Sequence, residues 1–239
     1  MDNSDSNQKL SKDYEVDSTN NAAHRKGIHF DEMVDYYSEW ARSGDYDKDL
    51  SQERYRGPMY AAEGLAEQVP ESERGSFLVL DIGAGTGFVG EELKKKGFSQ
   101  MDGLEPAIGM LEEARKRGVY SQLHHMGIGI EPVPIQDDHY NALVCSGAFG
   151  EGHVPCIALK EFIRLVKPGG LVVIMMRERY LEEVEEYRGR MEPFMKKLQV
   201  AGAWDCIRRE VKPRYSFNNN GVRFIYRVNI QGTVDVNMD

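Results

Sequence analysis

From residue 77 onward, short apolar runs alternate with amphipathic segments along the chain. A continuous apolar run bounded by turn residues is typical of a strand buried on both faces of a parallel sheet, and apolar positions three or four apart predict a helix. The alternation therefore predicts repeated strand–helix units in an open, doubly wound α/β sheet. The predicted strands are residues 77–82, 100–104, 123–126, 142–146 and 171–176, and the helices are residues 88–96, 107–118 and 155–166.

The pattern changes after the fifth predicted strand. A charged helix is expected over residues 181–201, with a core stripe, and two strands joined by the polar turn "NNNG" follow it. The stripe consists of Val184, Tyr187, Met191, Phe194, Met195 and Leu198. The terminal hairpin completes the predicted fold, a mostly parallel seven-stranded sheet with an antiparallel C-terminal edge and a Rossmann-like architecture.

The segment before the first strand divides into a tail and two helices. Residues 1–26 are polar and charged with few apolar side chains, so we expect a disordered tail. Phe30, Met33, Val34 and Tyr37 have helical spacing, and a second helix is expected from Gly57 or Pro58 to about Gln68 after a polar break. We expect one domain over residues 27–239, with a helical lid at 27–70 and an α/β core at 76–239.

Composition and charge narrow the class of protein. The formal net charge of −9 over 239 residues argues against broad electrostatic binding of nucleic acid. Three cysteines, an odd number, favour a reducing compartment, so we expect a cytoplasmic protein, with the nucleus as the alternative. The absence of a long apolar run predicts no membrane span. We expect a monomer.

The stretch "LDIGAGTG" places glycines immediately after the first predicted strand, a position suited to binding a nucleotide. Gly85, Gly87 and Gly90 fit the dinucleotide pattern G-x-G-x-x-G, and Glu105 lies 20 residues after Gly85, where a ribose-binding acid is expected. A dehydrogenase is therefore one interpretation. Asp81 opposes it, because two like charges about 4 Å apart repel by roughly 4 kcal/mol at an effective dielectric near 20. A cationic cofactor such as S-adenosyl-L-methionine would instead be attracted.

Three motifs together resemble those of class I S-adenosylmethionine-dependent methyltransferases. They are "LDIGAGTG", "GLEPAIGMLEEAR" and "LKEFIRLVKPGGLVVI", in the order and spacing of that family. The flanking segments "YYSEWARSGDYDKDL", "GHVPCIALKEFIRLVKPGG" and "LQVAGAW" resemble the methyltransferase-like protein 27 family. The resemblance implies a Rossmann-like class I fold, S-adenosyl-L-methionine as cofactor, and a small-molecule or protein methyl acceptor.

The resemblance also implies roles for individual residues. The glycine turn would line the methionine and ribose, Asp81 would orient the amino-acid end, and Glu105 would accept both ribose hydroxyls. Adenine would lie between Pro106 and Met110, with backbone contact at Gly127 or Ile128, since the acid usual after the third strand is absent. The remaining expected residues are Gly83, Ala84, Gly85, Thr86 and Gly87 in the turn, Ser146 and Gly147 beside the reacting centre, and Tyr37, Trp40 and Tyr46 in an aromatic lid.

The sequence leaves the acceptor and any catalytic residue unassigned. The segment "CSGAFGEGHVP" after the fourth strand lacks an N/D-P-P-Y signature, which weakens assignment as a DNA-adenine or glutamine methyltransferase. His153 is a candidate general base, although a loop histidine is more often structural. His124 and His125 point to opposite faces of a strand, so no metal site is expected. A catalytically silent, cofactor-binding regulatory module stays open as an alternative.

Overall fold

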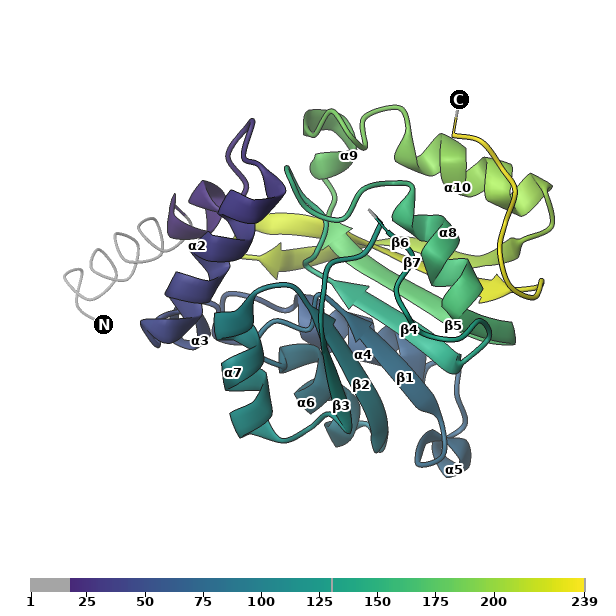
Figure 1. The fold of residues 1–239 in the computed structure, drawn as a ribbon, viewed down its shortest axis with the longest axis horizontal. Helices are drawn as coiled ribbons and strands as arrows, with labels where there is room; N and C mark the ends of the chain where they lie inside the picture. Colours follow the sequence, from purple (N-terminus) through teal and green to yellow (C-terminus); the bar gives the residue numbers. More distant parts are fainter. Residues whose placement is uncertain (1–17, 130, 239) are drawn as a thin grey trace.

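A computed structural model describes residues 18–129 and 131–238, so the first 17 residues of the tail predicted at 1–26 lie outside the described residues. The described chain forms one seven-stranded sheet in the order β3-β2-β1-β4-β5-β7-β6 (Figure 1). Strands β1 to β5 are parallel, and β7 runs antiparallel to both of its neighbours. The predicted fold class is therefore confirmed. The strands are β1 Leu78–Ile82, β2 Gln100–Glu105, β3 Gln122–His125, β4 Tyr140–Ser146, β5 Val166–Arg177, β6 Trp204–Ser216 and β7 Asn219–Val228.

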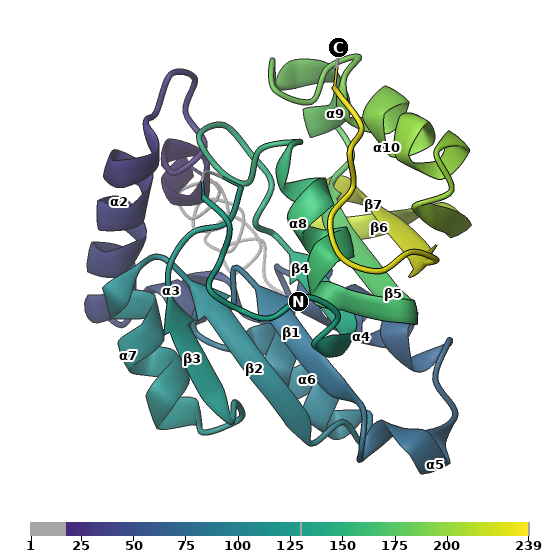
Figure 2. The ribbon, with the colours of Figure 1, turned by 45° about the vertical axis from the view of Figure 1, so that its right-hand side comes forward.

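Helices cover both faces of the sheet, because the central strands are apolar on both sides. Leu80 and Ile82 of β1 pack into the cluster beneath α8 (Ala158–Leu165) and α10 (Met191–Val200). Val79 packs into the opposite cluster beneath α4 (Gly57–Ala66) and α6 (Phe88–Lys95). Helix α7 (Ile108–Arg117) packs along β2 and β3, and the short α5 (Glu71–Arg74) precedes β1. Figure 2 shows α8 and α10 on one side of the sheet, and α6 on the other.

The long helix expected over residues 181–201 is wrong. The segment forms α9 (Tyr180–Glu183), a turn, and α10. Gly189 takes a positive φ of 67° in that turn, where glycine alone pays no Cβ penalty. The break allows the Tyr187 hydroxyl to accept a hydrogen bond from the Gly150 N–H at 2.9 Å and to donate to the Val154 carbonyl at 2.8 Å. The Tyr187 hydroxyl thus forms hydrogen bonds with backbone groups of the loop after β4, which a continuous helix would leave without this partner.

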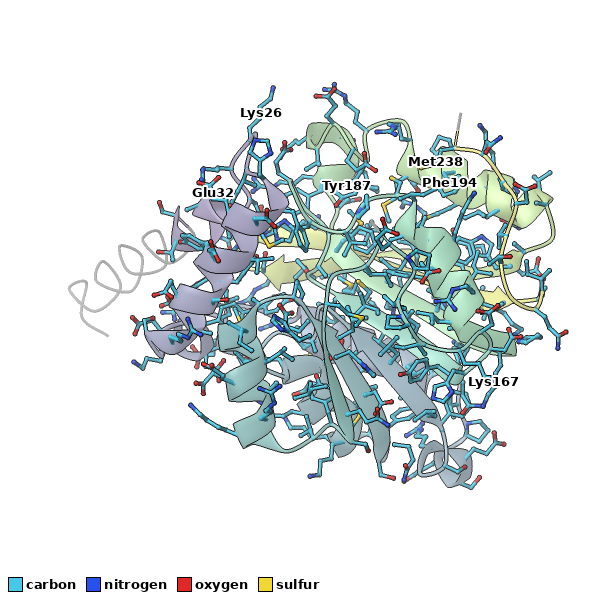
Figure 3. All side chains as sticks on the ribbon, in the orientation of Figure 1. Lys26, Glu32, Lys167, Tyr187, Phe194 and Met238 are labelled. Atoms are coloured by element: carbon cyan, nitrogen blue, oxygen red, sulfur yellow. The ribbon has the colours of Figure 1, made fainter. Side chains whose placement is uncertain are left out.

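The core stripe predicted for this segment is nevertheless confirmed, since all six of its side chains are buried. Figure 3 labels Phe194 beside Met238 near the C-terminal end of the described chain. Val234 packs on the same cluster, and Lys197 Nζ donates to the Met238 carbonyl at 3.0 Å. The C-terminal segment therefore covers part of the core formed by α10.

The N-terminal boundaries differ from the prediction. Residues 18–22 are helical and Ala23 is fully buried, so the predicted tail at 1–26 includes ordered residues. Helix α2 (Phe30–Arg42) confirms the first predicted helix, and α3 (Tyr46–Asp49) forms within the expected polar break. Helix α4 packs its alanines, Ala61 and Ala62, under the sheet, so it belongs to the core and not to the lid predicted at 27–70.

The terminal hairpin is confirmed, with a bulge near its turn. The register of β6 against β7 shifts between Lys212 and Ser216. Arg214 within this bulge has a φ of 53°, a left-handed conformation that is strained for a residue with a Cβ. β-Bulges of this kind bend a strand and change where its side chains point, often beside active sites.

Candidate functional site

A cavity of about 350 Å³ opens at the carboxyl ends of β1, β2 and β4. The strand order reverses between β1 and β4, which is where ligands bind in open α/β sheets. The volume lies within the range of about 300–1,000 Å³ typical of small-molecule pockets. Residues of the N-terminal segment and of α2 (Phe30–Arg42) also line the cavity; Figure 1 shows α2 beyond the carboxyl ends of these strands.

The glycine turn forms one wall of this cavity. Gly83 and Gly85 have φ values of 68° and 55°, a region that other residues occupy at a cost. A Cβ on Gly83 would lie 2.5 Å from the Ala148 Cβ, so this position has no room for a side chain. A Cβ on Gly85 would meet only the Tyr46 hydroxyl at 3.8 Å and the Gly83 carbonyl at 3.9 Å. Gly85 therefore lets a ligand approach the backbone closely.

Glu105 lies at the end of β2, opposite the turn. Its carboxylate accepts hydrogen bonds from the Gly85 N–H at 2.9 Å and the Ala107 N–H at 2.8 Å. Burial raises the pKa of Glu105 to about 7, and the two backbone donors oppose that rise. A carboxylate has about four lone-pair sites, so each oxygen can still accept a hydroxyl from a ligand.

Asp81 lies behind the turn and does not line the cavity. Its Oδ2 accepts a hydrogen bond from the Tyr120 hydroxyl at 2.6 Å, while Oδ1 is buried and has no hydrogen-bond partner among the described residues. Burial raises the pKa of Asp81 to about 7; the Tyr120 hydrogen bond opposes this rise, and the charge of Glu105 adds to it. The orphaned oxygen is an acceptor that a nearby donor or positive charge would satisfy.

Two of the three aromatic residues predicted as a lid line the cavity. Tyr37 from α2 and Tyr46 from α3 contact it, and Trp40 packs behind them with its ring centroid 4.8 Å from that of Tyr46. The Trp40 indole N–H donates to Asp49 Oδ2 at 3.0 Å. Trp40 therefore fixes α3 to α2 without facing the cavity.

Polar contacts fasten α3 to the glycine turn. The Thr86 hydroxyl donates to Asp47 Oδ1 at 2.7 Å, and Arg117 forms an ion pair with the same carboxylate. The Arg117 Nε also donates to the Thr86 carbonyl at 2.6 Å. The Thr86 side chain thus helps to join α3 and α7 to the glycine turn. This role explains why the side chain does not face the cavity.

The structure brings most of the expected cofactor residues together around the cavity. Those that line it are Tyr37, Tyr46, Gly83, Gly85, Glu105, Pro106, Met110, Ile128, Ser146 and Gly147. Those that do not are Trp40, Asp81, Ala84, Thr86 and Gly87. Pro106 and Met110 line the cavity, as do the apolar side chains of Phe30, Met33 and Ile128.

The other end of the cavity is formed by residues that the sequence did not single out. Tyr55 precedes α4, Tyr215 comes from the β6 bulge, and Arg177 ends β5. A charged side chain at the carboxyl end of a buried parallel strand was the available signal for Arg177, since such ends face the site. Tyr55 and Tyr215 are 160 positions apart and carried no comparable signal.

Two histidines and a tyrosine form a hydrogen-bonded chain at this end. His153 Nδ1 lies 2.6 Å from the Glu151 carbonyl, so Nδ1 carries a proton and the neutral ring accepts at Nε2. The Tyr37 hydroxyl lies 3.2 Å from that Nε2 and 3.3 Å from His24 Nε2. Burial lowers the pKa of His153 to about 4 and that of His24 well below its usual value, so both rings are neutral near pH 7.

No helix among the described residues is long and apolar enough to cross a membrane. In the same part of the chain, no group of three or more His, Cys, Asp or Glu side chains is arranged to hold a metal ion.

Comparison with known proteins points to one chemistry. A family model described as a methyltransferase domain matches residues 79–170. The human methyltransferase-like protein 27 is 35% identical over 176 residues, 74% of this chain and 69% of that protein. The ubiquinone/menaquinone biosynthesis C-methyltransferase UbiE of Sinorhizobium fredii is 32% identical over 111 residues, 43% of this chain and 42% of that protein.

A chain from the solved complex that contains the Haloferax volcanii Trm112 methyltransferase activator has a similar fold. Its TM-score is 0.62 at 18% sequence identity, and the match covers 82% of this chain and 99% of that one. At this identity the similarity concerns the fold alone.

Proposed function

This chain belongs to the methyltransferase-like protein 27 family of S-adenosylmethionine-dependent methyltransferases, and from that premise we propose that it binds S-adenosylmethionine in the cavity and methylates a small molecule. The observation that carries the proposal is the cradle formed by Gly83, Gly85 and Glu105 at the strand-order reversal. The cavity volume of about 350 Å³ is that of a small-molecule pocket, so a small molecule is favoured over a protein acceptor.

The described residues fit the cofactor's chemistry at three points. Glu105 has acceptor sites left for two ribose hydroxyls, and the apolar lining residues Pro106 and Met110 suit an adenine ring. The buried Asp81 Oδ1 is an unsatisfied acceptor behind the turn, favourable to a cofactor that carries positive charge. The phenol rings of Tyr37 and Tyr46 are suitable neighbours for a sulfonium.

Methyl transfer needs little from the protein beyond alignment and exclusion of water. The cofactor supplies an activated methyl group, and orienting two reactants contributes up to about 7–11 kcal/mol in well-ordered systems. Ser146 at the end of β4 lines the cavity beside the tyrosines, with its Oγ 3.4 Å from the Tyr55 hydroxyl. The acceptor therefore binds beside Tyr55, Tyr215 and His153.

Calorimetry tests the proposal directly. We expect S-adenosylmethionine and S-adenosylhomocysteine to bind the purified full chain with micromolar affinity, and NADH to give no heat. The reverse pattern would refute the proposal and favour a dehydrogenase. Turnover is then measured with a labelled methyl group against metabolite and protein extracts. Cofactor binding without transfer to either extract would identify the regulatory module instead.

The affinity for S-adenosylmethionine is expected to rise with pH. The pKa values of Asp81 and Glu105 are about 7 in the cofactor-free protein because both groups are buried, so each is partly protonated near neutrality. A cationic cofactor favours the ionised forms, so binding lowers both pKa values and releases protons. Affinity should increase up to about tenfold per pH unit for each carboxyl from pH ~5.5 to ~7, then level off.

Calorimetry in buffers of different ionisation enthalpy measures this proton release. In Asp81→Asn one of the two carboxyls is gone, so its affinity should depend less steeply on pH. Proton uptake on binding, or an affinity independent of pH in the unmodified protein, would contradict the expectation.

A further inference from the structure

Two tyrosine hydroxyls converge on the end of β4. The Tyr55 hydroxyl lies 3.4 Å from Ser146 Oγ and 3.4 Å from the Tyr215 hydroxyl. The two rings meet edge to face, with centroids 5.4 Å apart. All three residues line the cavity, on the wall where the acceptor is proposed to bind. We call Tyr55, Tyr215 and Ser146 the hydroxyl cluster.

The backbone is shaped to bring the tyrosines here. Tyr215 follows the strained Arg214 in the β6 bulge. The bulge interrupts the regular alternation of side chains along β6 and so changes the direction in which the Tyr215 ring points. The Arg56 N–H donates to the Tyr215 carbonyl at 2.8 Å, and Tyr55 forms an isolated antiparallel bridge with Ser216. Residues distant in the sequence are thereby held in register at the cavity.

Glycines from three separate elements leave the space that the rings occupy. A Cβ on Gly147 would lie 2.2 Å from the Tyr55 hydroxyl, and one on Gly57 would lie 2.5 Å from the Tyr215 ring. A Cβ on Gly221 of β7 would lie 2.7 Å from the Tyr215 Cβ. The missing side chains at these three positions leave room for both rings, whose hydroxyls approach to 3.4 Å.

The hydroxyl cluster has more donors than it uses. Three O–H groups linked in a chain use two protons for the two hydrogen bonds between them, which leaves one proton for another acceptor. Burial raises the pKa of Tyr55 and raises that of Tyr215 well above its usual value, so both remain protonated donors. Arg177 lies on the same wall, where its Nε donates to Ser216 Oγ at 3.0 Å. This wall therefore favours an oxygen atom, above all one with negative charge.

We propose that Tyr55 and Tyr215 are positioning residues that hold an oxygen of the methyl acceptor, which is a small molecule carrying a carboxylate or phenolic oxygen near its nucleophilic atom. The inference rests on the proposed function, because it places the acceptor beside the cofactor. His24, His153 and Tyr37, whose side chains are neutral near pH 7, also line the cavity; among the described residues the one carboxylate that lines it is Glu105, at the position proposed for the cofactor ribose. A cationic amine is accordingly disfavoured at this site.

Three probes of similar size test the inference on the protein saturated with S-adenosylhomocysteine. Benzoate and phenol present an oxygen, and benzylamine presents an ammonium. Dissociation constants come from ligand-observed NMR titrations. We expect benzoate to bind at least tenfold more tightly than benzylamine. The double variant Tyr55→Phe/Tyr215→Phe should weaken benzoate about tenfold or more, since it removes both phenolic hydroxyls that could donate to the charged oxygen.

The matched control is Tyr226→Phe. Tyr226 lies on β7, stacks on Trp204 with centroids 4.0 Å apart, and does not line the cavity, so benzoate affinity should stay unchanged. The inference is overturned if benzylamine binds as tightly as benzoate, if neither oxygen probe binds, or if benzoate affinity survives both substitutions. Calorimetry with S-adenosylhomocysteine on the unmodified protein and on each variant separates this inference from the proposed function. If the unmodified protein does not bind the cofactor, the proposed function itself is refuted.

Discussion

Glu105→Gln is expected to weaken the binding of S-adenosylmethionine by at least tenfold. The carboxylate accepts the N–H groups of Gly85 and Ala107, and in the proposed complex it also accepts the ribose hydroxyls. A hydrogen bond to a charged group contributes about 1.5–3 kcal/mol, which corresponds to a factor of about 10 to 150 in affinity. Glutamine replaces one acceptor oxygen with an N–H donor, so one backbone donor or ribose hydroxyl loses its partner. Calorimetry on both proteins measures the change.

Glu113→Gln is the matched control for this substitution. Glu113 lies on α7, pairs with Lys116, and does not line the cavity, so its loss should leave cofactor affinity unchanged. Thermal unfolding of each cofactor-free variant shows whether Glu105→Gln also disturbs the glycine turn. An unaltered dissociation constant for S-adenosylmethionine in Glu105→Gln would show that Glu105 does not bind the ribose hydroxyls.

The fold could be predicted from the sequence because its determinants are local. Largely apolar runs such as Leu78–Ile82, where Asp81 is the one polar residue, are buried on both faces. Each structural strand up to β4 begins within two residues of its predicted range. The glycine turn and Glu105 could also be predicted from the sequence. The backbone conformation at Gly83 and Gly85 depends on adjacent residues, so a local pattern identifies the turn. The predicted strand at 171–176 begins later than β5, because residues 166–170 pair irregularly with β4 across a register shift.

The features that sequence reasoning missed depend on contacts between distant segments. Residues 18–26 are polar in composition, yet Asn20 and Ala23 are buried, and Asn20 lines the cavity. Tyr55 and Tyr215 meet only because the β6 bulge and the bridge between residues 55 and 216 bring them together. The break in the helix before α10 lets the Tyr187 hydroxyl reach its hydrogen-bond partners, which lie in the loop after β4. No periodicity within these segments encodes such pairings.

The charge of Asp81 marked it as a candidate site residue, but its position relative to the cavity could not be predicted from the sequence. The sequence suggested that its charge acts at the cavity, whereas its carboxylate lies behind the turn and bonds Tyr120. Its influence on a ligand therefore acts through the turn and not by direct contact in the described structure. Whether Asp81 orients the amino-acid end of the cofactor stays a prediction, which the pH dependence of Asp81→Asn tests.

Gly109→Ala is expected to destabilise the protein and to weaken cofactor binding together. A Cβ at Gly109 of α7 would lie 2.2 Å from the Ser38 carbonyl oxygen, an atom of the α2 backbone that cannot rotate away. Overpacking of this kind costs about 1–3 kcal/mol, and alanine regains only about 0.5–1 kcal/mol through its higher helix propensity. Helix α2 must therefore shift away from α7, and Tyr37, next to Ser38, moves with it.

The expected fall in melting temperature is about 2–4 °C for each kcal/mol lost in a domain of this size. Gly75→Ala is the control, because Gly75 has an ordinary φ of −64° and a Cβ there would meet no atom within 4 Å. That variant should melt at or slightly above the temperature of the unmodified protein. If Gly109→Ala melts with its control and binds S-adenosylmethionine equally well, the close approach of α2 to α7 does not hold the cover of the cavity in place. If it melts lower and binds more weakly, the position of α2 controls the cofactor site, because Gly109 itself does not line the cavity.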